Sequence, residues 1–216
     1  MNEKTGAVFS IAKDNQPVTG CTISKEVYAS GQDYISYFSL AQDTDISAEI
    51  YNYHKLLILH EGIMEVFTDK QVRTLNEGKA LLTPMEIPVG MRTDTKAIYT
   101  EISIRRNTMN NAVKVGEVFK LAELLPYQEG KIINIDVAHN EKMKFVIMSF
   151  GECTGLAEHA APGEALIFAL EGKGVIGYEG EAHPIQAGEN FKFAAGGKHW
   201  VKADGRFKMA LLITFE

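Results

Sequence analysis

The chain has few cysteines, no long apolar run and no excess of positive charge, and each shortage excludes a class of protein. Its two cysteines, Cys21 and Cys153, are too few for the disulfide framework of a small secreted domain. No apolar run approaches the ~20 residues that a membrane-spanning helix needs, so we expect no membrane partner. Acidic side chains outnumber basic ones by 28 to 22, and a net charge of −6 argues against binding to nucleic acid. The N-terminal residues do not form a secretory signal, so a cytoplasmic protein is expected.

The second half of the chain repeats the pattern of the first half at a constant offset of 110 residues. The segment GAVFSIAK at 6–13 falls on GEVFKLAE at 116–123, and HKLLILHEG at 54–62 falls on EALIFALEG at 164–172. Glycines, apolar runs and turns all keep this offset, which is far longer than the period of a solenoid repeat. We interpret the pattern as a duplicated domain, with halves at 1–107 and 112–216 joined by a short polar stretch.

Each half is composed of short apolar runs separated by turn residues. Runs of this length and spacing are typical of the strands of an all-β sandwich or barrel. Only VFSIAK at 8–13 and VFKLAELL at 118–125 indicate helices, each of a turn or two. Some runs, such as LLILH and ALIFAL, are apolar on both faces, which favours strands covered by a second sheet. Self-association is therefore expected, with a homodimer as the predicted assembly.

The spacing of residues after Gly188 matches a known family motif. The run from His159 to Ala203 resembles the cupin family, whose second motif is Gly, five residues, Pro-x-Gly, two residues, His, three residues, Asn. Ala194, Gly196, His199 and Ala203 follow Gly188 at those spacings, with alanine in place of the proline and the asparagine. The resemblance implies two tandem cupin barrels of the double-stranded β-helix or jelly-roll type, with minor short helices. It resembles a bicupin.

The first cupin motif, which ends in His-x-His, a glutamate and a glycine, is only partly retained. His159 takes the first histidine position and Gly172 the closing glycine, whereas Ala161 and Ala165 occupy the positions of the second histidine and the glutamate. Glu164 lies one residue before the glutamate position. In the first half, the family's ligand positions hold no metal-binding set, so we predict that the N-terminal barrel is degenerate. These four positions are Glu49, Tyr51, Lys55 and Val89.

The resemblance implies a site for one divalent transition metal, such as Ni, Zn, Fe or Mn, in the C-terminal barrel. His159 and His199 stand at family ligand positions, and Glu164 is the candidate third ligand. Imidazole and carboxylate together suit these metals. Strand alternation opposes this set: if Ala165 faces inward, Glu164 faces outward unless a bulge turns it. A pair of pocket histidines with no ion is the alternative.

Alanine at these positions favours small-molecule binding inside the C-terminal barrel. Ala161 and Ala165 would make a pocket larger and more apolar than one filled by histidine and glutamate, and small-molecule sites are mostly apolar with a few polar groups. The leading hypothesis is therefore a binding protein for a small organic molecule, with His159, His199, Ala161 and Ala165 as ligand-binding residues and with or without a metal ion. A metal-dependent enzyme, dioxygenase-like or isomerase-like and centred on His159 and His199, is the alternative. A metal-free enzyme of the sugar-epimerase kind, with one of these histidines as general base, is a third.

Overall fold

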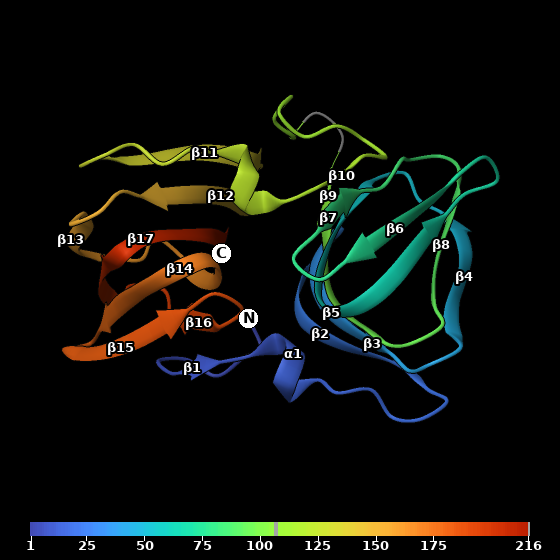
Figure 1. The fold of residues 1–216 in the computed structure, drawn as a ribbon, viewed down its shortest axis with the longest axis horizontal. Coiled ribbons are helices and arrows are strands. Elements are labelled where there is room, and N and C mark those ends of the chain that lie inside the picture. The colour runs from blue at the N-terminus through green and yellow to red at the C-terminus, as the bar shows by residue number, and fades with distance from the viewer. Residues whose placement is uncertain (106–107, 216) are drawn as a thin grey trace. The chain divides into compact units, whose positions relative to one another are not determined.

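The computed structural model describes residues 1–105 and 108–215, and strands make up most of it (Figure 1). The chain divides into two compact units. The N-terminal unit is Ile11–Lys120, and the C-terminal unit combines Met1–Ser10 with Leu121–Glu216. The predicted boundary at residue 107 lies outside the described residues. No helix among the described residues is long and apolar enough to cross a membrane.

The N-terminal unit is a curled sheet of nine strands, preceded by the short helix α1 (Ile11–Asp14). Its strands are β2 (Thr22–Ser30), β3 (Asp33–Leu40), β4 (Thr44–Ile50), β5 (His54–Phe67), β6 (Val72–Asn76), β7 (Ala80–Leu82), β8 (Pro88–Thr93), β9 (Ala97–Ile104) and β10 (Val118–Phe119). They run in the order β10-β7-β5-β9-β3-β2, with β6 and β8 also on β5 and β4 on β8. The stacked rings of Phe38 and Tyr99, 5.1 Å apart, belong to the core that this curl encloses.

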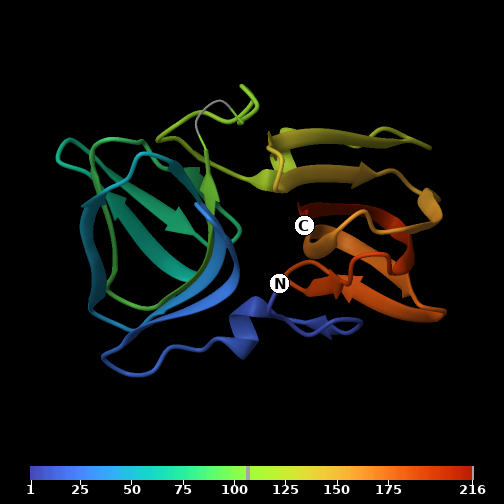
Figure 2. The same cartoon turned by 180° about the vertical axis from the view of Figure 1, so that it is seen from behind.

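The C-terminal unit is a curled sheet of eight strands with one 3-10 helix, η1 (Leu121–Leu124), and Figure 2 shows both units from behind. Its strands are β1 (Val8–Phe9), β11 (Ile132–His139), β12 (Met143–Phe150), β13 (Gly155–Ala160), β14 (Glu164–Tyr178), β15 (Glu181–Gln186), β16 (Asn190–Phe193) and β17 (Lys198–Thr214). They run in the order β1-β16-β14-β17-β12-β11, with β15 on β14 and β13 on β17. The expected all-β fold with minor short helices is confirmed, and its sheets curl into half-barrels.

The elements of the two units recur at the offset seen in the sequence. Strand β3 begins at residue 33 and β12 at 143, and both are eight residues long. The bulges also correspond, because β5 shifts register between Leu59 and Glu61 and β14 between Ala169 and Glu171. The short first strand of each half pairs with a strand of the other half: β1 with β16, and β10 with β7.

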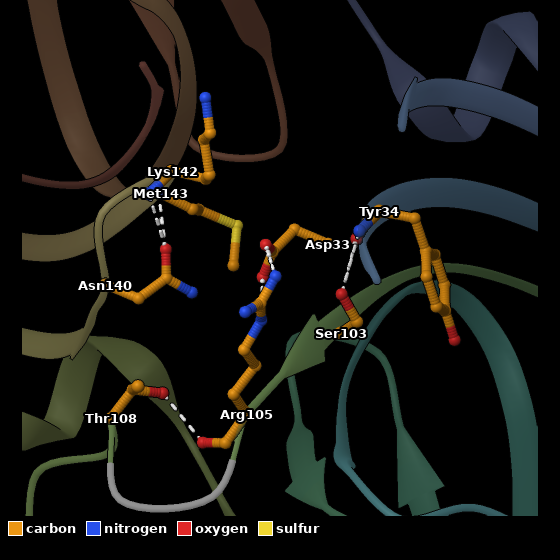
Figure 3. A network of polar contacts seen from close by, with 8 residues as sticks. All are labelled: Asp33, Tyr34, Ser103, Arg105, Thr108, Asn140, Lys142 and Met143. Carbon is orange, nitrogen blue, oxygen red and sulfur yellow. Dashed lines mark hydrogen bonds and ion pairs between the residues drawn. The ribbon is translucent and has the colours of Figure 1, made fainter. Parts of the chain in front are cut away.

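Within each unit, side-chain hydrogen bonds connect the ends of neighbouring strands (Figure 3). In the N-terminal unit, Arg105 Nε donates a hydrogen bond of 3.1 Å to the carboxylate of the buried Asp33, and the backbone N–H of Tyr34 donates to Ser103 Oγ at 2.8 Å. These contacts tie the start of β3 to the end of β9. In the C-terminal unit, Asn140 Oδ1 accepts from two backbone N–H groups in the turn between β11 and β12, each at 2.8 Å. An asparagine that caps its own turn in this way fixes the hairpin.

Candidate functional site

The C-terminal unit contains a cavity of about 310 Å³. Its lining comes from strands β11, β12, β13, β14, β16 and β17 and from the turn after β13. Along β17 every second residue contributes, as in Met209, Leu211 and Ile213. This period of two identifies the lining as the inward face of the curled sheet. Aliphatic and aromatic side chains, including Met148 and Phe193, form most of the wall.

The structure brings four predicted site residues to this cavity. His159, His199, Ala161 and Ala165 all line it, although they come from three separate strands and one turn. Ala161 and Ala165 are buried, at 5% and 2% exposure, so their small side chains define the hollow itself. A histidine and a glutamate at these two positions would extend into the space that the cavity occupies.

The two histidines face one another across neighbouring strands. His159 on β13 and His199 on β17 are register partners, and their ring centroids are 4.1 Å apart. The ring of Phe193 also stacks on His199, with centroids 4.1 Å apart and an angle of 26° between planes. His199 is buried and His159 is exposed, so the pair extends from the interior to the rim of the cavity. Ring packing on this scale restrains the imidazole of His199.

The hydrogen bonds of the pair decide which ring nitrogen is protonated. Nδ1 of His159 lies 2.9 Å from the carbonyl oxygen of Ala157, and Nδ1 of His199 lies 3.1 Å from that of Gly197. A carbonyl oxygen can only accept, so each Nδ1 carries the hydrogen and each neutral ring keeps an Nε2 lone pair. Burial lowers the pKa of His199; the hydrogen bond with the Gly197 carbonyl acts against this, and the nearby His159 adds to it. The neutral form with an accepting Nε2 is therefore the state of His199 at neutral pH.

Glu164, the candidate third metal ligand, lies elsewhere. Its carboxylate pairs with Lys192 Nζ at 2.6 Å and also with the terminal amine of Met1, and it does not line the cavity. The register shifts of β14 lie beyond Ala169, so no bulge turns Glu164 inward. The carboxylate that does line the cavity, Asp136, is paired with Lys144 at 3.0 Å.

The residues present do not fit a tightly held metal ion. Within residues 1–105 and 108–215, no group of three or more His, Cys, Asp or Glu side chains is arranged to hold one. His159 and His199 supply two imidazole ligands, whereas protein metal sites usually take three or four. The predicted set of His159, His199 and Glu164 is therefore not assembled in this structure.

Comparison with known proteins assigns the part of the chain that contains this cavity. Residues 145–215 match the family model of the cupin domain, and this segment includes both histidines. This segment is therefore similar to a cupin domain over those residues. No curated protein matches the chain in sequence.

Solved structures share the fold over more of the chain. The cupin 2 conserved barrel domain protein from Leptotrichia buccalis is 25% identical, with a TM-score of 0.84 over 99% of this chain and 98% of that one. Protein Ylba from E. coli is 14% identical, with a TM-score of 0.60 over 98% and 92% of the two chains. A salicylate 1,2-dioxygenase from Pseudaminobacter salicylatoxidans is 12% identical, with a TM-score of 0.60 over 85% and 71%. The last two likenesses concern the fold alone.

The N-terminal unit differs from the cupin domain at the corresponding positions. Lys55, the counterpart of Ala165, is buried and pairs with the buried Glu101 at 3.1 Å, and its ammonium lies 3.7 Å from the centre of the Tyr51 ring. The hydroxyl of Tyr34 donates to the same carboxylate at 2.5 Å, and that of Tyr51 donates to Glu49. Our sequence reasoning missed Glu101 and Tyr34. The available signal was a charged residue inside an otherwise apolar strand, as in AIYTEISI.

The two cysteines are free and exposed. Cys153 lies in the turn before β13. Its φ of 62° is in the left-handed region that favours glycine.

Proposed function

We propose that this protein is a bicupin whose C-terminal cupin domain binds a small organic molecule in the cavity beside His159 and His199. The recurrence of elements at 110 residues supports the duplicated barrel, because strands, bulges and turns all keep it. The cavity itself supports the binding function. Its volume of about 310 Å³ is at the lower end of known ligand pockets, and its wall is apolar with a few polar groups.

The single observation that carries the proposal is the position of Ala161 and Ala165. Both are buried side chains on the cavity wall, at places where the cupin motif has metal ligands. The two alanines take the places of two metal ligands of the motif, and they also leave an apolar space in the cavity. A small organic molecule would fill this apolar space and bind to the two imidazoles, which hold no metal ion in this proposal.

A cavity-filling variant tests the proposal. Ala165→Leu places a larger apolar side chain in the cavity, and we expect it to abolish saturable binding of small aromatic molecules measured by ligand-observed NMR. Glu158→Gln is the matched control, because Glu158 is exposed on β13 and does not line the cavity. Binding that survives Ala165→Leu in a folded protein would place the ligand elsewhere and refute the proposal.

The second candidate function is a metal-dependent enzyme, dioxygenase-like or isomerase-like, centred on His159 and His199. The structural likeness to salicylate 1,2-dioxygenase favours it, and the missing third ligand opposes it. Metal analysis of protein purified without a nickel column separates the two. A near-stoichiometric transition metal that is lost in His199→Ala would favour the enzyme, whereas metal-free protein that binds small molecules favours the binding function.

A further inference from the structure

We infer that the ligand of this cavity is an apolar molecule whose head group donates a hydrogen bond, such as an alcohol, a phenol or an amine, and that carboxylates of the same shape are excluded. The inference rests on the proposed function, since it concerns the ligand of the same cavity. It follows from the direction of the hydrogen bonds around His159 and His199.

The first step is the chemistry that the two histidines present. Both Nδ1 atoms are used by backbone carbonyls, at 2.9 Å from Ala157 and 3.1 Å from Gly197. Each Nε2 is thereby an acceptor, and neither has a hydrogen-bond partner among the residues that the structure describes. The rings are 4.1 Å apart by centroid, and because His199 is buried, its Nε2 favours a donor from the ligand, whereas the exposed His159 is also open to water.

The second step is the charge balance of the cavity. Besides the histidines, its charged lining groups are Asp136 and Lys144, which pair with each other at 3.0 Å. The cation is thus already neutralised, and the wall carries no surplus positive charge. A carboxylate ligand would lose its hydration and meet two lone pairs, which is costly because a buried anion needs donors. A hydroxyl or ammonium group avoids this cost, because it can donate a hydrogen bond to His159 or His199.

The third step concerns the rest of the ligand. The rest of the lining includes apolar side chains such as Met148, Met209 and Leu211, and Phe193 stacks on His199. Methionine adapts to irregular shapes and makes favourable contacts with aromatic rings. An apolar body, aromatic or aliphatic, with one donating head group therefore satisfies the whole lining.

Four probes that share one phenyl ring test the inference at pH 8. Benzyl alcohol and benzylamine carry donors, benzoate carries an anion and toluene has no polar group. We expect the two donors to bind at least about tenfold more tightly than toluene and benzoate, by titration followed with NMR or calorimetry; tenfold corresponds to about 1.4 kcal/mol. Tighter binding of benzoate, or equal binding of benzyl alcohol and toluene, would overturn the inference.

Variants that keep the ring and remove the acceptor complete the test. His199→Phe and His159→Phe should bring benzyl alcohol and toluene to within about twofold of one another while toluene binding persists. Glu158→Gln should leave the preference unchanged. A preference that persists in both phenylalanine variants assigns the acceptor to other groups and overturns the inference. If none of the four probes binds, the inference fails, whereas the proposed function is tested by the Ala165→Leu comparison with other small aromatic molecules.

Discussion

Lys55 Nζ lies 3.1 Å from Oε1 of Glu101, and both side chains are buried in the N-terminal unit. Register explains the contact: Lys55 on β5 is opposite Ser103 on β9, so Glu101 is its diagonal neighbour on the same face. The Tyr51 ring and the Tyr34 hydroxyl complete the surroundings. Lys55 thus stands at a position that holds a metal ligand in the cupin motif, and its own side-chain ammonium is the cation that pairs with Glu101.

Replacing the lysine alone should be costly. Lys55→Met leaves the Glu101 carboxylate buried without its cation, and we expect the free energy of unfolding to fall by roughly 3–5 kcal/mol in urea titrations. Lys96→Met is the matched control, because Lys96 forms a partly exposed pair with Glu61 and should cost less than about 1 kcal/mol. Adding Glu101→Leu to Lys55→Met should recover part of the loss. Equal costs for Lys55→Met and Lys96→Met would show that the buried pair has no special role.

The stability of the protein should depend on pH through His60. Burial lowers the pKa of His60 to about 4, and its Nε2 lies 2.7 Å from Thr100 Oγ1. An unfolded histidine titrates near 6.5, so between these values the unfolded state binds the extra proton. Stability is therefore retained above about pH 6.5 and lost as the pH falls toward 4, by at most about 3 kcal/mol.

A variant without this histidine isolates the effect. His60→Gln should flatten the curve of unfolding free energy against pH between about 4 and 7, relative to the unmodified chain. Urea midpoints at several pH values measure both curves. Parallel curves for the two proteins would mean that His60 is not responsible for the loss of stability in acid.

A glycine at position 153 should stabilise the C-terminal unit. Cys153 has φ of 62°, a conformation that costs an ordinary residue free energy but is readily adopted by glycine. We expect Cys153→Gly to raise the free energy of unfolding by about 0.5–1 kcal/mol, measured by urea denaturation under reducing conditions. Cys153→Ala removes the thiol and keeps the Cβ atom, so it should give no gain. A gain in both variants would trace the effect to the sulfur rather than to the backbone.

The sequence was sufficient to predict the strands, and alternation indicated an outward-facing Glu164, although Glu164 stayed the candidate third metal ligand. Alternation along a strand is a local property, so it could be applied to Ala165 and Glu164 without knowing their neighbours, and the structure places them as alternation requires. The pairing of β1 with β16 could not be found this way. A two-residue strand, Val8–Phe9, carries no pattern that specifies a partner near the other end of the chain.

The candidate site was less accessible from sequence. The motif spacing identified His159 and His199, but their 4.1 Å separation and their shared protonation pattern depend on the register of β13 with β17. The contact of Lys55 with Glu101 depends likewise on long-range pairing of β5 with β9. Polar groups inside apolar strands can be noticed in one sequence, whereas their partners are set by tertiary structure.

Placing the ligands of the cupin motif at Ala161 and Ala165 tests whether these alanines limit metal binding in the C-terminal unit. Ala161 and Ala165 line the same cavity as the two histidines, so Ala161→His with Ala165→Glu would direct three imidazoles and one carboxylate into one space. Such a set suits Ni²⁺ or Zn²⁺. We expect the double variant to retain close to one ion per chain after dialysis, measured by mass spectrometry of the metal content, and the unmodified chain to retain far less.

The control is the same double variant with His199→Ala, which should lose most of the ion because only two imidazoles and the carboxylate remain. Circular dichroism establishes that each variant is folded, since new polar groups in the cavity are costly unless the metal satisfies them. Equal metal content in the unmodified chain and the double variant would mean that the alanines do not prevent metal binding. The two imidazoles would then form a metal centre with ligands other than those at the positions of the cupin motif.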